Sequence, residues 1–315
     1  LTNTLNKGDR VLSARFGQFS HLWIEMCKKL HIEVEVVDVD WGSGTPHDEF
    51  EKILSQDKNH EIKAVLVTHN ETSTGVTNDV KATRDLLNKL NHPALLFVDG
   101  VSSIGSIKFE MDAWGVDVAV SGSQKGFMLP AGLAISCVSQ KALEIAKSAN
   151  LPRAYFDYHD MLKINETGYW PYTNPMPLLR GLREALTMMH EEGLDNIYAR
   201  HLFLAQAVQK ASVAWGLNLC AKDSSLYSNT VTAIMVPEGI DSTDIVKTAY
   251  NKYNTSFGGG LNKVAGKLFR IGHLGDLNST MILGAISTAE LAMYDVGIKF
   301  ELGSGVAAAI KHLKV

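Results

Sequence analysis

The chain has 315 residues, of which 45% are hydrophobic and 20% charged, and its formal net charge is −4. This length allows a large core and two domains, and the composition is that of an ordinary globular protein. The weak negative charge gives no electrostatic reason to expect nucleic acid as a partner. The apolar runs are far shorter than the roughly 20 residues that span a bilayer, so we expect no membrane segment.

Alternating apolar runs and amphipathic stretches fill the first part of the chain. Near-continuous Val/Leu/Ile runs that alternate with helices are typical of an α/β domain with a mostly parallel sheet covered on both faces. The predicted strands cover 34–40, 63–69, 94–100, 116–123 and 132–139, and the predicted helices cover 18–30, 78–91 and 140–149.

A second set of elements follows residue 177. Its strands are fewer and more polar than those upstream, which indicates a smaller α+β domain. We expect a large cofactor-binding domain at 1–192 and a small C-terminal domain at 193–315. The predicted helices cover 178–192, a segment ending at Gly216, 241–253 and 280–297, and the predicted strands cover 230–237 and 267–272.

The three cysteines carry no pattern of a disulfide or a metal site. Cys27, Cys137 and Cys220 lie far apart and form no CxxC pair. We interpret them as buried small apolar residues of a reducing compartment. The chain shows no signal or address motif, so the expected location is the cytoplasm.

Two reactive side chains follow neighbouring predicted strands. Asp99 ends "ALLFV", and Lys125 lies in the loop "SGSQKG" after "VDVAV". Ligands of open α/β sheets bind outside the carboxyl ends of the strands, where both residues are expected. Taken alone, Asp99 is equally well a turn residue and Lys125 an exposed lysine. Together they match the needs of pyridoxal 5′-phosphate, which takes a lysine as Schiff-base partner and an acid at its ring nitrogen.

Other stretches fit the same edge of the sheet. Ser121, Ser123 and Gln124 offer donors for a phosphate group, and "THNETSTG" (68–75) is rich in short hydrogen-bonding side chains. Arg270 lies in the apolar strand "LFRIG", where a guanidinium needs a partner. A substrate carboxylate is one candidate partner, and an internal salt bridge is the alternative.

Three other chemistries lack their sequence patterns. His69 and Glu71 have no second ligand at metal-binding spacing. "DGVSSIG" is not a GxSxG nucleophile elbow, and no GxGxxG follows a strand. Acyl transfer and a nucleotide cofactor are therefore not favoured.

The motifs "HNETSTG", "VDGVSSIG", "SGSQKG", "PLLRGLREAL" and "FRIGHLG" occur together in one family. In this order the chain resembles the class V aminotransferases of fold type I, within the branch of serine–glyoxylate and alanine–glyoxylate aminotransferases. The resemblance covers essentially the whole chain. It implies amino transfer from serine, alanine or aspartate to glyoxylate, which gives glycine and a 2-keto acid.

The resemblance also implies a role for individual residues. Lys125 corresponds to the lysine bound covalently to pyridoxal phosphate, and Asp99 to the partner of the ring nitrogen. Arg270 corresponds to the arginine that binds the substrate α-carboxylate. The remaining cofactor contacts implied in this way are Thr72, Gln124, the ring of Phe19, and Thr173 acting on the neighbouring subunit of a homodimer.

The family carries a Ser-Gly-Thr-Gly-Ala type phosphate loop that this chain does not contain. By resemblance, "LTNTLNKGDRVL" (1–12) is interpreted as the continuation of the helix after that loop. About 80 residues that include the loop are accordingly expected to precede Leu1. Two alternatives to the aminotransferase stay open at this stage. One is another class V reaction such as desulfuration, which needs a mobile cysteine, and the other is a non-catalytic homologue that binds cofactor poorly.

Overall fold

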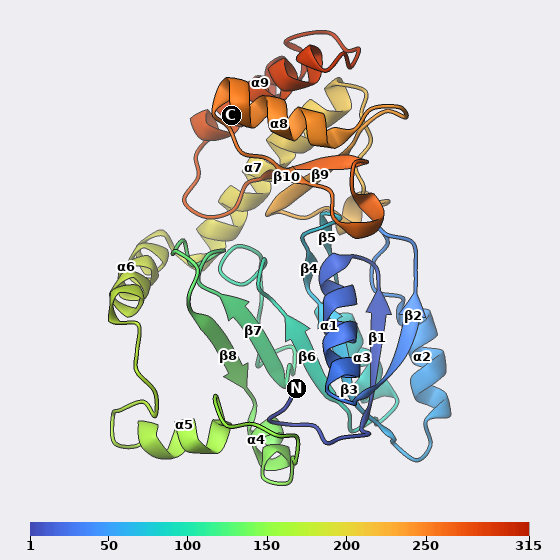
Figure 1. Cartoon of the computed structure of the whole chain (residues 1–315), viewed down its shortest axis with the longest axis vertical. Coiled ribbons are helices and arrows are strands. Elements are labelled where there is room, and N and C mark those ends of the chain that lie inside the picture. The colour runs from blue at the N-terminus through green and yellow to red at the C-terminus, as the bar shows by residue number, and fades with distance from the viewer. Residues whose placement is uncertain (315) are drawn as a thin grey trace.

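The computed structural model describes residues 1–314 and is built around a six-stranded sheet (Figure 1). The strand order is β2-β1-β3-β6-β7-β8, and all neighbours are parallel except β7 and β8. The strands are β1 (Arg10–Arg15), β2 (Glu33–Asp38), β3 (Ile62–Thr68), β6 (Leu95–Asp99), β7 (Val118–Gly122) and β8 (Ala134–Val138). The short strands β4 (Asn70–Glu71) and β5 (Val76–Thr77) form a separate hairpin. The expected α/β class is confirmed.

Helices cover both faces of this sheet because its central strands are apolar on both sides. Alternate residues of β1 enter different cores, Leu12 on one face and Val11 on the other. Leu12 shares its core with Phe50 and Leu87, and Val11 shares its core with Cys27 and Ala142. The covering helices are α1 (Gln18–Lys29), α2 (His47–Gln56), α3 (Val80–Lys89) and α4 (Gln140–Ala146).

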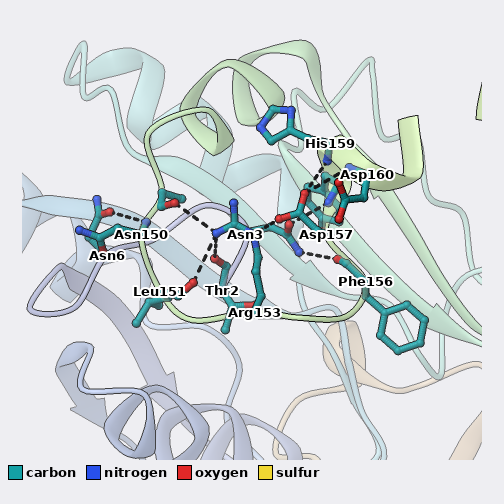
Figure 2. Close-up of polar contacts among 12 residues, drawn as sticks. Thr2, Asn3, Asn6, Asn150, Leu151, Arg153, Phe156, Asp157, His159 and Asp160 are labelled. Carbon is teal, nitrogen blue, oxygen red and sulfur yellow. Dashed lines mark hydrogen bonds and ion pairs between the residues drawn. The ribbon is translucent and has the colours of Figure 1, made fainter. Parts of the chain in front are cut away.

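The start of the chain is not helical, so the interpretation of residues 1–12 was wrong. Turns occupy the first residues, and β1 begins at Arg10 in the middle of the sheet. Asn3 exchanges hydrogen bonds with the 150–160 segment, donating to Phe156 O (2.9 Å) and accepting from Tyr158 N (2.9 Å) (Figure 2). Thr, Asn and Gly favour such contacts over helix, which explains the difference.

The elements that follow residue 192 form a second layer of structure, which lies at the top of Figure 1. Gly193, with φ of +82°, separates α6 (Met176–Glu192) from α7 (Leu194–Ala214). The antiparallel sheet β10-β11-β9 packs with the later helices around a core that includes Ile234, Phe269 and Ile286. Its elements are β9 (Val231–Met235), α8 (Ser242–Tyr253), β10 (Gly258–Gly259), β11 (Leu268–Gly272), α9 (Ser279–Asp295) and α10 (Ser304–Leu313).

Most predicted strands and helices are present, and three helices were missed. These are α2, α5 (Tyr158–Asn165) and α10. Cys27 and Cys220 are buried as expected, but Cys137 is exposed because it lies on the edge strand β8. Among residues 1–314, no helix combines the length and apolar character needed to cross a membrane.

Candidate active site

Asp99 lies at the carboxyl end of β6, in register with Thr68 of β3 and Val120 of β7. Its carboxylate accepts one hydrogen bond, from the backbone N–H of Val101 (3.0 Å). The pKa of Asp99 is raised to about 6, mainly by burial and also by the negative charge of Glu71, while the Val101 hydrogen bond and Lys125 oppose the shift. An acid with so few donors gains most from a cationic partner.

Lys125 lies in the turn that follows β7. In the sheet, β7 is the neighbour of β6, the strand that ends at Asp99 (Figure 1). Ser123 fixes this turn, since its hydroxyl donates to Pro130 O (2.8 Å) and accepts from Leu133 N (3.1 Å). Gly126 is required here, because a Cβ would lie 2.2 Å from the carbonyl oxygen of Ile104. Ser123 therefore has a structural role, and its expected role as a phosphate donor is not supported.

The amine of Lys125 makes no hydrogen bond or ion pair within residues 1–314. Partial burial lowers its pKa, and the nearby Arg270 guanidinium lowers it further, against the opposite effect of Asp99. A lysine with a lowered pKa is a better nucleophile and base near neutral pH. Lys125 thus interacts electrostatically with both Asp99 and Arg270, although the three residues come from separate elements.

Arg270 lies on β11 and points toward the large sheet. Its Nε donates to Gly259 O (3.0 Å) and its Nη1 donates to Thr72 O (3.0 Å). No carboxylate oxygen of residues 1–314 lies within 4.0 Å of this guanidinium. The alternative of an internal salt bridge is therefore wrong. Gly258 allows the close approach of the backbone, since a Cβ there would lie 3.1 Å from Arg270 Nε.

Thr72 lies on the loop between β4 and β5. Its hydroxyl donates to Ser102 Oγ (2.7 Å), and Ser102 in turn donates to the carbonyl oxygen of Asn70 (2.9 Å). Asn70 also donates to Ser102 and to Thr230, which joins the loop to the second layer. Since the hydroxyl proton of Thr72 is used within this network, its oxygen is free only as an acceptor.

For three other residues predicted to contact the cofactor, the structure gives only their position in the fold. Gln124 is exposed and adjoins Lys125 in the same turn. Phe19 lies in the first turn of α1, partly buried, and its backbone N–H donates to Glu71. Thr173 is exposed in the segment between α5 and α6, which Figure 1 shows outside the edge strand β8. These three assignments stay predictions.

Two residues near the site were not assigned a role from the sequence. Phe16 directly follows β1 and is almost fully buried (1% exposed) in the core that also contains Leu12 and Phe50, so its role is packing beneath this edge of the sheet. Recognition of β1 as a strand would have revealed it. Glu71 is completely buried and binds the start of α1, a contact between distant segments that no local pattern predicts.

Comparison with known proteins decides the family. Residues 1–257 match the family model described as aminotransferase class-V. The chain belongs to the class V aminotransferase family. Over 312 residues this aminotransferase is 59% identical to the "Serine--glyoxylate aminotransferase" of Hyphomicrobium methylovorum, an alignment that covers 98% of this chain and 77% of the relative.

Two further relatives show how names vary within this family. The "L-aspartate--glyoxylate aminotransferase" of Paracoccus denitrificans is 54% identical over 318 residues, covering 100% of this aminotransferase and 79% of the relative. The crystal structure of pyridoxamine-pyruvate aminotransferase from Mesorhizobium loti superimposes with a TM-score of 0.92 at 28% identity. It covers 99% of this chain and 80% of that one. The predicted family and the fold type I architecture are confirmed.

Proposed function

We propose that this chain is a pyridoxal 5′-phosphate-dependent aminotransferase that moves the amino group of serine, alanine or aspartate to glyoxylate. The products are glycine and a 2-keto acid. The proposal rests mainly on three reactive groups that form no ion pairs with one another. They are the amine of Lys125, the buried carboxyl of Asp99 and the guanidinium of Arg270, which has no carboxylate partner within residues 1–314. Relatives named as glyoxylate aminotransferases at 59% and 54% identity support the choice of acceptor.

The donor set fits pyridoxal phosphate. Asp99 has a single hydrogen bond and a raised pKa, so a cationic ring nitrogen would relieve the cost of its burial. Lys125 supplies a primary amine for covalent attachment from the turn after the adjacent strand β7. Thr72, Gln124 and Phe19 are proposed as further contacts. When bound, the cofactor supplies the electron sink that stabilises negative charge at the substrate Cα.

The residues of this chain would perform the remaining steps. Arg270 binds the α-carboxylate of the amino donor bidentately and fixes its orientation while Gly259 and Thr72 hold the guanidinium in place. Lys125 Nζ, deprotonated more readily because of burial and Arg270, takes the proton from the substrate Cα. The same two groups serve glyoxylate, which presents the same carboxylate.

The cysteines do not favour desulfuration as the reaction. A nucleophilic cysteine must reach the thiolate form. Burial raises the pKa of Cys27 and of Cys220 to about 11. The pKa of Cys137 is also raised, by partial desolvation even though the residue is exposed and by the negative charge of Asp112. All three thiols are thus held in the protonated form near neutral pH.

The proposal includes a homodimer with shared active sites. Thr173 is exposed, and aromatic side chains near it are exposed as well: Tyr155, Phe156, Tyr169 and Trp170. Such a concentration of exposed aromatic residues is typical of an interface. A division at residue 192, with a large domain at 1–192 and a small one at 193–315, belongs to the same proposal.

A donor panel with glyoxylate as the acceptor tests the function. Serine, alanine and aspartate are supplied separately to the purified protein with added cofactor, and glycine is measured. Glycine formation that disappears in Lys125→Ala supports the proposal. Equal glycine formation by Lys125→Ala, or none by the wild type with any of the three donors, contradicts it.

A further inference from the structure

Glu71 is a buried carboxylate with an unusual set of partners. It is 0% exposed, and its oxygens accept hydrogen bonds from the backbone N–H groups of Phe19 (3.1 Å) and Ser20 (3.0 Å). They also accept from the N–H (3.2 Å) and hydroxyl (2.7 Å) of Ser73. All four partners are donors, which is the arrangement that an ionised carboxylate requires. No Lys, Arg or His nitrogen of residues 1–314 lies within 4.0 Å of it.

This carboxylate caps α1 from a distant segment. The N-cap residue of α1 is Gly17, which has no side chain to bind the free N–H groups. A Cβ at Gly17 would lie 2.2 Å from the Cδ atom of Glu71, so the glycine makes room for the carboxylate. Ser73 adds a further bond by accepting from the N–H of Gln18 (2.9 Å). The loop at 71–73 is thereby attached to the start of α1.

The same loop contacts the site on its other side. Thr72, the next residue, accepts a hydrogen bond from Arg270 through its carbonyl and donates to Ser102 through its hydroxyl. The charge of Glu71 also acts on two site groups, since it raises the pKa of Asp99 and opposes the lowering of the pKa of Arg270. The charged groups that act on Asp99 are therefore Glu71 and Lys125, of opposite sign.

We propose that Glu71 is a positioning residue of the active site, which fixes the loop carrying Thr72 against α1 and places a carboxylate where it acts on Asp99 and Arg270. This inference rests on the proposed function. The negative charge of Glu71 would favour retention of the proton between the Asp99 carboxylate and the ring nitrogen of bound pyridoxal phosphate. It also favours the charged form of Arg270. A cap that acted only on helix stability would have neither effect.

The chain contains a matched control in Glu290. It is also buried (3% exposed) and caps α10 from another element, accepting from the N–H groups of Gly303 (2.7 Å), Gly305 (2.8 Å) and Val306 (3.1 Å). It accepts from Trp215 Nε1 (2.8 Å) as well. All these partners lie in the second layer, away from Asp99 and Lys125.

The experiment compares wild type, Glu71→Gln, Glu71→Asp and Glu290→Gln. Two quantities are measured besides thermal stability: the titration of the Asp99 carboxyl by ¹³C NMR in cofactor-free protein, and the dissociation constant of added pyridoxal phosphate. We expect both Gln variants to lose thermal stability. Glu71→Gln alone should titrate Asp99 at a lower pH than wild type and bind the cofactor about tenfold more weakly. Glu71→Asp keeps the charge and should keep the wild-type titration.

The two measurements distinguish a failure of this inference from a failure of the proposed function. If Glu71→Gln matches Glu290→Gln in Asp99 titration and cofactor affinity, Glu71 is only a helix cap and the inference is overturned. If wild type fails to bind the cofactor, the proposed function falls, and the Asp99 titration still decides whether Glu71 sets the charge of the site.

Discussion

Arg270 Nη1 lies 3.0 Å from the carbonyl oxygen of Thr72, a hydrogen bond between residues 198 positions apart in the chain. This contact joins β11 to the loop beside the large sheet. Both hydrogen-bond partners of Arg270 are backbone carbonyls, and its guanidinium forms no ion pair within residues 1–314. A substrate carboxylate can therefore supply the missing negative charge.

Loss of this charge should weaken substrate binding strongly. Arg270→Gln keeps a hydrogen-bonding side chain but cannot form the bidentate ion pair. We expect kcat/KM for the amino donor to fall about 100-fold, mainly through a higher KM. Steady-state kinetics with saturating glyoxylate measures this fall, and an unchanged KM would remove Arg270 from the substrate site.

Gly258 should be needed for the position of Arg270. A methyl group at Gly258 would lie 3.1 Å from Nε and 3.2 Å from Nη2 of Arg270, so Gly258→Ala must displace the guanidinium. We expect KM for the donor to rise about tenfold. The matched control is Gly259→Ala, since a Cβ at Gly259 would meet no atom within 4 Å. Equal KM values for the two variants would contradict this account of β10.

The ionised Asp99 side chain should lower the free energy of unfolding, although the proposed reaction needs it. Its folded pKa of about 6 lies above the ordinary aspartate pKa of 3.8, so its contribution to stability is complete below pH 3.8 and is lost as the pH rises through 6. At pH 8 the cofactor-free Asp99→Asn variant should therefore be more stable than wild type, by about 2 kcal/mol or less, yet inactive. Urea unfolding at pH 8 and at pH 4 measures the difference, which should be smaller at pH 4. Lower stability of Asp99→Asn at pH 8 would oppose this prediction.

His273 should contribute to acid unfolding. It is completely buried, its Nδ1 lies 2.9 Å from Asn229 O and its Nε2 lies 2.9 Å from Thr232 Oγ1. Burial lowers its pKa from 6.5 to about 4, so its stabilising contribution is present above pH 6.5 and is lost as the pH falls toward 4. The full loss corresponds to about 3 kcal/mol.

The test compares wild type with His273→Gln, which cannot take up a proton at this position. Its free energy of unfolding should fall less steeply between pH 6.5 and 4 than that of wild type, even if the variant is less stable at pH 7. Chemical unfolding at several pH values gives both slopes. Parallel curves would show that His273 does not titrate in this range.

Local sequence patterns were sufficient to place Asp99 and Lys125 at the ends of two neighbouring strands. Each follows an apolar run, and parallel strands place such residues at one edge of the sheet. The interpretation of residues 1–12 as a helix rested on the family resemblance and not on a local pattern. It missed β1, which overlaps this stretch at residues 10–12.

Contacts between distant segments could not be predicted in this way. The bond from Glu71 to the start of α1 depends on the packing of the β4–β5 loop against α1, and the Arg270–Thr72 bond depends on how the two layers meet. Ser123 shows the reverse error, since a serine expected to bind phosphate is used to fix its own turn. Residue type and position indicated the cofactor chemistry, whereas the tertiary fold determined which polar groups were already paired.

Covalent trapping of the cofactor tests the central claim most directly. The purified protein is incubated with pyridoxal phosphate, reduced with borohydride, digested and examined by peptide mass spectrometry. If Lys125 binds the cofactor covalently, we expect one modified peptide, with the reduced cofactor on Lys125, and no such modification in Lys125→Ala. Stoichiometric attachment to a different lysine, with Lys125 unmodified, would contradict it.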